Sequence, residues 1–114
     1  EIGAHTPSHV QVAQLTRQEA LAELSQPKLI LEEKLNTTIH SFAYPYGRKA
    51  ACAPWTRQLL ADSGYRLACT MMEGRLRPDS DLLQLPRLGI NGLDSLDQFQ
   101  RKLRGDYDFL RCLG

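Results

Sequence analysis

The chain has 114 residues, of which 42% are hydrophobic and 24% charged, a composition typical of one small globular domain or of part of a larger one. Its 14 basic and 13 acidic residues nearly balance, and no basic cluster interleaved with aromatic residues indicates nucleic-acid binding. No apolar run approaches the roughly 20 residues that a membrane-spanning helix needs, and no signal peptide is visible.

The N-terminal third predicts a strand end, a loop and a long helix. We expect residues 1–5 to end a strand and residues 6–15 to form a loop or short turn, since Pro7 disfavours helix at the residue before it. Thr16-Arg17-Gln18-Glu19 is a capping box that predicts a helix start. Four apolar residues fall near one stripe and predict one buried face: Ala20, Leu24, Leu31 and Leu35. Pro27 lies inside this pattern and predicts one bent helix or two short ones.

The remaining two thirds of the chain alternate between short apolar segments and helical patterns. Residues 39–44 are expected to form a strand that stops at Pro45-Tyr46-Gly47, and Pro54 and Trp55 open a helix that ends at Gly64. The later expected elements are a strand at 65–71, a polar loop at 73–82, an extended stretch at 83–90 around Pro86, and a helix from Asp94 or Ser95 to Gly105. This alternation predicts an α/β fold built from βα units of a barrel or an open sheet.

The chemically most suggestive feature is the histidine pair in the segment EIGAHTPSH. Imidazole nitrogen is a preferred zinc ligand, so His5 and His9 are candidates to hold one ion. The metalloprotease pattern HExxH fits poorly, because Thr6 occupies the position of its glutamate and Pro7 disfavours its helix. A loop at the carboxyl end of a strand can also bring both rings to one ion. From the spacing alone, a metal site and two unrelated surface histidines both stay open.

EIGAHTPSH, followed by a capped helix and then by SFAYPYG, resembles the polysaccharide deacetylase family (NodB-homology domains, carbohydrate esterase family 4). His5, Thr6 and His9 match the family motif H-[S/T]-x-x-H, and residues 42–47 fall where its R-x-P-x-G-like turn is expected. GYRLACT at 64–70 and the later LPRLGINGLDSLDQFQRKL also look like the family, so the resemblance spans essentially the whole chain. It implies that residues 1–114 are part of a distorted (β/α) barrel of the NodB-homology type, with N-terminal strands missing.

The resemblance implies a metal-dependent hydrolase that removes acetyl groups from an N-acetylated polysaccharide or oligosaccharide. His5 and His9 carry over as two metal ligands, with Zn²⁺ expected first and Co²⁺, Ni²⁺ or Fe²⁺ as alternatives. The family's third ligand and its general base are aspartates of an earlier motif, and no Asp precedes His5 here. We therefore expect a C-terminal portion, starting at Glu1 downstream of the natural N-terminus, that is inactive in isolation. The resemblance also favours a bacterial cell envelope or secreted location.

The family motifs imply roles for several further residues. The backbone N–H of Tyr46, in the Pro45-Tyr46-Gly47 turn, is the implied oxyanion donor, although the turn could simply end a strand. Many family members have arginine where this chain has Ala43, and Arg48 is a candidate substitute. No histidine follows His40 to match the family's late catalytic histidine, which makes Arg87 a candidate catalytic residue. The expected substrate-binding residues are Pro45, Tyr46, Arg48 and Trp55, and a buried anchor is the alternative for Trp55.

Three functions stay open on the sequence. The first is a metal-dependent carbohydrate N-deacetylase of which this chain is a portion. The second is a catalytically incomplete remnant that binds sugar or metal, which Ala43 and the absent aspartates favour. The third is a metal site without hydrolase activity. Because an incomplete barrel leaves strand edges unpaired, we also expect a homodimer through those edges.

Overall fold

A parallel three-stranded sheet occupies the middle of the chain in this computed structural model, which describes residues 1–109. The strand order is β1 (Ser41–Ala43), β2 (Leu67–Glu73), β3 (Leu85–Arg87), and both neighbouring pairs are parallel. Ala4 extends the sheet beyond β1 through a parallel bridge to Phe42. The parallel pairing confirms the predicted α/β organisation, because each parallel connection needs a crossover.

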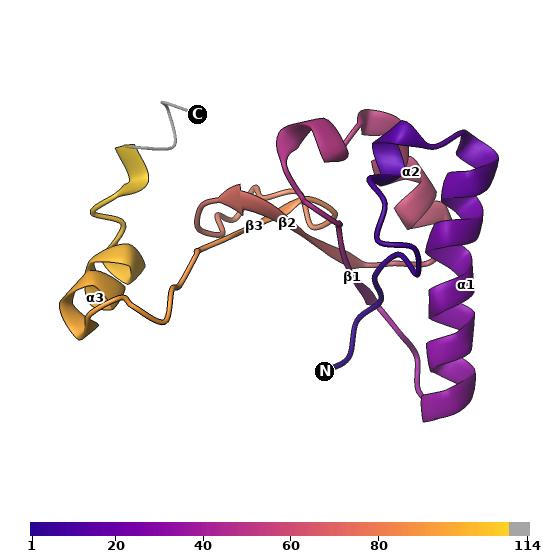
Figure 1. Cartoon of the computed structure of the whole chain (residues 1–114), viewed down its shortest axis with the longest axis horizontal. Coiled ribbons are helices and arrows are strands. Elements are labelled where there is room, and N and C mark those ends of the chain that lie inside the picture. The colour runs from indigo at the N-terminus through magenta and orange to yellow at the C-terminus, as the bar shows by residue number, and fades with distance from the viewer. Residues whose placement is uncertain (110–114) are drawn as a thin grey trace.

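Within residues 1–109, α-helices and short 3₁₀ turns connect and flank these strands. Helices α1 (Arg17–Leu35) and α2 (Pro54–Asp62) pack together at one end of the sheet, and α3 (Leu96–Arg104) lies beyond its other end (Figure 1). The turns are η1 (Val12–Gln14) and η2 (Lys49–Ala51). None of the helices within residues 1–109 is long and apolar enough to cross a membrane.

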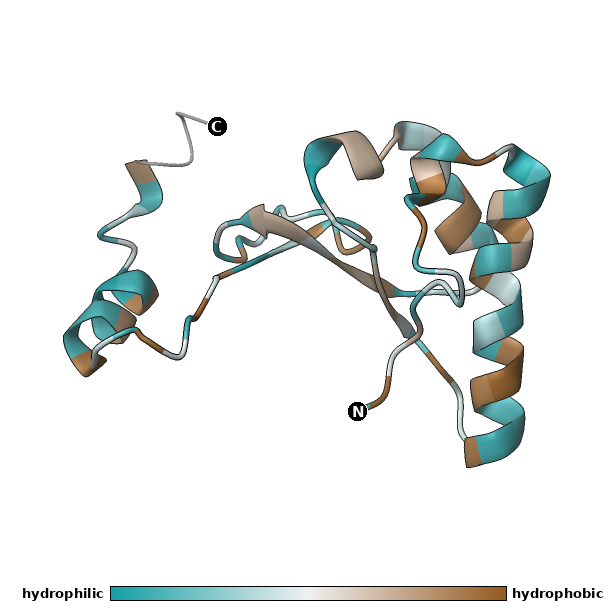
Figure 2. Ribbon diagram, viewed as in Figure 1, coloured by the Kyte–Doolittle hydropathy of each residue, from teal (hydrophilic) through white to brown (hydrophobic). Residues whose placement is uncertain are grey.

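The hydrophobic core lies between the sheet and the α1–α2 pair. Its most buried large side chains come from α1, α2, β1 and the loops beside them: Phe42, Leu24, Ile39, Leu60 and Val12. Helix α3 contributes no buried residue, and its ribbon is largely hydrophilic apart from a few exposed apolar turns (Figure 2). The sheet and the α1–α2 pair therefore carry the core, and α3 lies outside it.

Helix α1 begins as predicted but continues through its proline. Thr16 accepts a hydrogen bond from the Glu19 backbone N–H while the Glu19 carboxylate accepts from the Thr16 N–H, which confirms the capping box. Of the two expected outcomes, one bent helix or two short ones, the structure has a single helix, which runs through Pro27 to Leu35. Pro27 is buried, so its ring gains core packing that offsets the lost backbone hydrogen bond. The buried stripe is shorter than predicted, since Leu35 is 42% exposed.

Replacing Thr16 with Ala should lower the free energy of unfolding by about 1 kcal/mol, because it removes the cap of the longest helix. Urea denaturation of the full-length protein measures the effect. Thr37→Ala is the matched control, since Thr37 is exposed in the loop after α1. Equal unfolding midpoints for the two variants would contradict the stabilising role of the cap.

The expected boundaries hold for the helices better than for the strands. Pro54 opens α2, Ser95 caps α3, and Gly105 ends α3 with a left-handed backbone. By contrast, the strand expected at 65–71 is displaced to Leu67–Glu73 and enters the predicted loop, because Glu73 pairs with Arg87 beyond an irregularity in the register. The extended stretch at 83–90 contains only the short strand β3.

Candidate active site

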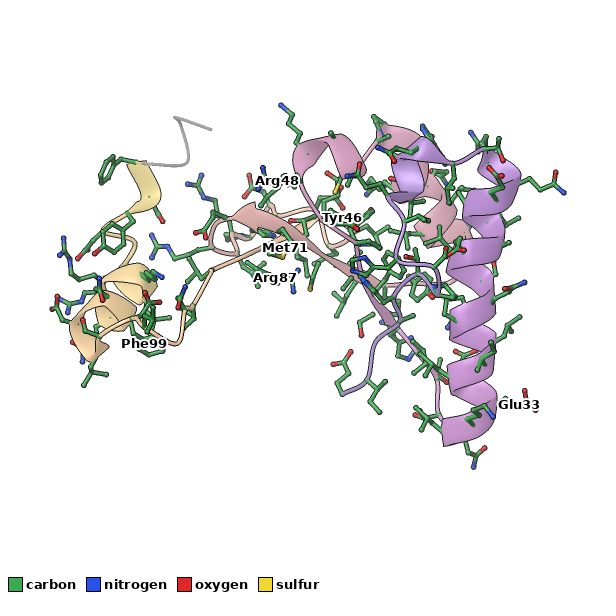
Figure 3. All side chains as sticks on the ribbon, in the orientation of Figure 1. Glu33, Tyr46, Arg48, Met71, Arg87 and Phe99 are labelled. Carbon is green, nitrogen blue, oxygen red and sulfur yellow. The ribbon has the colours of Figure 1, made fainter. Side chains whose placement is uncertain are left out.

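The predicted site residues converge at the carboxyl ends of the parallel strands. His5 follows the bridge at Ala4, Tyr46 follows β1, and Arg87 ends β3. They line one cavity of about 490 Å³ whose wall consists of His5, His9, Ala43, Tyr44, Tyr46, Arg48, Met71 and Arg87. Figure 3 shows the labelled side chains of Tyr46, Arg48, Met71 and Arg87 grouped beside β2. Parallel strands therefore gather residues that lie far apart in the sequence.

His5 is fixed by a hydrogen bond through its ring. The Nδ1 atom lies 2.6 Å from the Ala43 carbonyl oxygen. Because a carbonyl can only accept, Nδ1 is the donor of this bond, and Nε2 is the ring nitrogen left to face a ligand. This is the arrangement in which metal-ligating histidines are commonly held. His5 is thus oriented with one nitrogen available to a ligand.

His9 faces His5 from the other end of the loop. The two ring centroids lie 5.0 Å apart, with the ring planes inclined by 59°. Two imidazoles on one tetrahedral zinc ion place their centroids about 5 Å apart, because each ligating nitrogen lies about 2 Å from the metal. The His9 ring also meets the Tyr46 ring edge-on at 4.9 Å. The spacing of the two histidine rings therefore fits shared coordination of one ion.

The ligand set within the described chain is incomplete. Residues 1–109 contain no group of three His, Cys, Asp or Glu side chains that could together hold a metal ion. Catalytic zinc sites use three protein ligands and keep one position open. His5 and His9 could supply two ligands to a divalent cation, and residues 1–109 place no third such side chain beside them.

The turn after β1 holds two successive residues in the left-handed region. Tyr46 has φ 60° and Gly47 has φ 41°. The Gly47 carbonyl accepts a 2.8 Å hydrogen bond from the Met71 N–H, which fastens the turn to β2. Within residues 1–109, the Tyr46 N–H donates no backbone hydrogen bond. The turn therefore combines a backbone that is fastened to β2 with an N–H that has no backbone acceptor among the described residues.

The two arginines give the cavity wall positive charge. Arg87 donates from Nε to the Thr70 carbonyl at 2.6 Å, so its guanidinium is tethered to β2 while the side chain stays exposed. Arg48 is exposed, follows the Pro45-Tyr46-Gly47 turn directly and precedes η2. No carboxylate from the described residues lines the cavity. A carbonyl oxygen that gains negative charge would find cationic partners here.

Two of the predicted substrate-binding side chains do not line the cavity. Pro45 is fully buried, so its ring shapes the turn and stays out of reach of a ligand. Trp55 is half-buried in the first turn of α2 and packs against the core. The structure therefore places neither side chain in the cavity wall, and the substrate contacts expected of Pro45 and Trp55 stay predictions. The half-buried position of Trp55 fits the buried-anchor alternative.

Tyr44 is a cavity residue that the motifs do not single out. Its ring is buried, and its hydroxyl donates to the Leu83 carbonyl at 3.1 Å. Burial raises the pKa of the Tyr44 hydroxyl well above its usual range, so this group stays neutral. Phe42 in β1 and Tyr44 just after it are two residues apart, which is a sequence signal that they share one face of an extended segment, but it does not reveal the cavity.

Comparison with protein families identifies the first part of the chain. The family model described as Polysaccharide deacetylase matches residues 1–68, more than half of the chain. No curated protein matches the sequence.

Solved structures with similar folds cover nearly the whole chain. The Streptococcus pyogenes deacetylase PplD in complex with acetate is 28% identical with a TM-score of 0.80, covering 88% of this chain and 43% of that one. The polysaccharide deacetylase BC0361 from Bacillus cereus is 23% identical with a TM-score of 0.76, covering 90% of this chain and 32% of that one. The putative polysaccharide deacetylase BA0330 from Bacillus anthracis is 24% identical with a TM-score of 0.75, covering 90% of this chain and 31% of that one. The chain thus spans less than half the length of these structures and has part of their fold.

Proposed function

Because the chain belongs to the polysaccharide deacetylase family, we propose that it is the histidine-bearing portion of a metal-dependent N-deacetylase acting on N-acetylated polysaccharides or oligosaccharides. The observation that carries the proposal is the approach of the His5 and His9 rings to 5.0 Å beside the Tyr46 N–H. The reaction would be hydrolysis of the acetamido group of a sugar, which yields acetate and a free amine.

The residues of the cavity have distinct roles in this proposal. His5, through Nε2, and His9 would hold the divalent cation, Zn²⁺ first, with Co²⁺, Ni²⁺ and Fe²⁺ as alternatives. A bound cation of this kind supplies Lewis acidity for amide hydrolysis. The Tyr46 N–H would donate to the acyl oxygen as it becomes negative, and the turn holds that donor in place beforehand.

Arg87 and Arg48 complete the proposed site as cationic groups. Arg87 is the better placed of the two, since its bond to the Thr70 carbonyl fixes the guanidinium at the cavity wall. A guanidinium there stabilises negative charge on the acyl oxygen and can also bind sugar hydroxyl groups. Arg48, which also lines the cavity and is exposed, would contact sugar units of the glycan that extend past the Tyr46 turn.

The alternative is a catalytically incomplete remnant that binds metal or sugar. The observation in its favour is that residues 1–109 provide neither a third acidic ligand nor a carboxylate in the cavity wall. Since the chain spans less than half of the structures it resembles, we propose that the third ligand and the general base come from another part of the full-length protein. The isolated chain is then expected to be inactive and to self-associate through unpaired strand edges.

Metal removal tests this function directly. Chelation of the full-length protein should lower acetate release from acetylated chito-oligosaccharides at least about tenfold, because the Lewis acid is lost. Addition of Zn²⁺, Co²⁺, Ni²⁺ or Fe²⁺ should restore it, while Mg²⁺, which prefers oxygen ligands, should not. Metal content is measured in parallel by mass spectrometry. Undiminished acetate release from metal-free protein would overturn the proposed metal dependence.

A further inference from the structure

The two histidines of the site are held in different ways. The His5 ring is oriented by its own bond to the Ala43 carbonyl, whereas His9 is exposed and its aromatic neighbours are the His5 and Tyr46 rings. The His9 backbone has φ 53°, a left-handed conformation that a non-glycine residue adopts only at a cost. The position of the His9 ring therefore depends on whatever holds the loop around it.

A carboxylate on α1 holds the residue next to His9. Glu23 Oε1 accepts from the Ser8 hydroxyl at 2.5 Å, and Oε2 lies 3.4 Å from the Ser8 backbone N–H. Hydrogen bonds to an ionised carboxylate are stronger than those between neutral groups. On the other side of the loop, the His9 N–H donates to the Thr6 carbonyl at 3.1 Å. The loop that carries His9 is thus held by one hydrogen bond within the loop and by the bonds from Ser8 to Glu23 on α1.

The helix that supplies this carboxylate is a firm support. Its first turn is closed by the capping box at Thr16, and its neighbouring residues Ala20 and Leu24 are fully buried. Glu23 is itself partly buried, while Ser8 is exposed. Because α1 is anchored in the core through Ala20 and Leu24, a bond from Ser8 to Glu23 ties the exposed loop to a helix that is packed against the core.

We propose that Glu23 is a positioning residue for His9. The Glu23 carboxylate accepts hydrogen bonds from Ser8. These bonds keep the adjacent His9 in the left-handed conformation that turns the His9 ring toward His5. The inference rests on the proposed function, in which these two rings hold a divalent cation. In this inference Glu23 has no role as a ligand, since both of its carboxylate oxygens lie against Ser8. It acts by preorganising a ligand before the ion binds.

Metal affinity is the readout that distinguishes positioning from a general structural role. Competition with a chromophoric chelator should show Zn²⁺ and Co²⁺ binding about tenfold weaker for Glu23→Ala than for the full-length wild-type protein. Ser8→Ala should weaken binding similarly, and the double variant should add little, because both changes remove the same contact. Glu23→Gln should lose less, since its amide oxygen can still accept from the Ser8 hydroxyl.

The matched control is Glu33→Ala. Glu33 is an exposed glutamate of the same helix, near its carboxyl-terminal end, as Figure 3 shows. This variant should bind metal as the wild type does, and all metal-free variants should melt within a few degrees of it. If Glu23→Ala destabilises the fold, Ser8→Ala in the exposed loop supplies the same comparison.

The possible results separate the two proposals. Wild-type metal affinity in both Glu23→Ala and Ser8→Ala, with binding lost in His9→Ala, would reject the positioning role and leave the metal site intact. Wild-type affinity in His5→Ala and His9→Ala would instead reject the metal site itself. Weaker binding in the Glu23 and Ser8 variants, without loss of binding in Glu33→Ala, supports the inference.

Discussion

His5→Ala is expected to leave the full-length protein without stably bound metal and to reduce acetate release at least about a hundredfold. The physical reason is that His5 is the better oriented of the two imidazoles, with Nδ1 committed to the Ala43 carbonyl and Nε2 free. Elemental analysis gives the metal content, and acetate release from acetylated chito-oligosaccharides gives the activity. His9→Ala should have a comparable effect, because one imidazole alone is a weak site.

The third histidine of the chain provides the control for this experiment. His40 precedes β1 at the opposite end of the strand and lines a separate cavity with Glu1, Thr38 and Arg66. His40→Ala should therefore keep wild-type metal content and activity. Wild-type metal content and acetate release in both His5→Ala and His9→Ala would show that the family's metal site has not been retained in this protein.

Gly47→Ala is expected to lower the free energy of unfolding by about 3 kcal/mol or more. A Cβ atom at this position would lie 2.4 Å from the Met71 backbone nitrogen, and the residue has φ 41°. Steric overlap and backbone strain therefore act together, and the obstructing atom is backbone that cannot rotate away. Urea denaturation measures the loss, and acetate release should fall with it because the turn also carries the Tyr46 N–H.

Two other glycines separate these contributions. Gly64 has φ 84°, but the nearest atom to an added Cβ is Lys28 Cε at 3.5 Å, so Gly64→Ala should cost about 1 kcal/mol through strain alone. Gly92 has nothing within 4 Å of an added Cβ, and Gly92→Ala should change stability by less than about 0.5 kcal/mol. If Gly47→Ala changed the free energy of unfolding no more than Gly92→Ala does, the predicted steric overlap between the turn and β2 would be contradicted.

Features set by neighbouring residues were predicted well from the sequence. The capping box at Thr16, the proline start of α2 and the serine cap of α3 all depend on interactions within one turn. The motif resemblance also predicted which residues would meet, and His5, His9, Tyr46, Arg48 and Arg87 do line one cavity. Parallel strands make this convergence predictable once the strand ends are known.

Features that depend on tertiary contacts were not predictable in the same way. Pro27 remains inside a helix because its ring is buried, and Pro45 is withdrawn from the cavity for the same reason. The bond from Glu23 to Ser8 joins a helix to a loop, and no local rule relates their spacing. The path of β2 to Glu73 follows from pairing with β3, which the polar composition of 73–82 conceals.

The left-handed backbone at His9 and Tyr46 has a consequence for how this protein can evolve. Glycine would relieve the strain at either position, so selection for stability alone would favour it. Glycine at 46 would even preserve the N–H, but it would remove the ring that meets His9 edge-on. Tyr46 in this conformation therefore lowers the stability of the turn but keeps an aromatic ring in contact with the His9 ring.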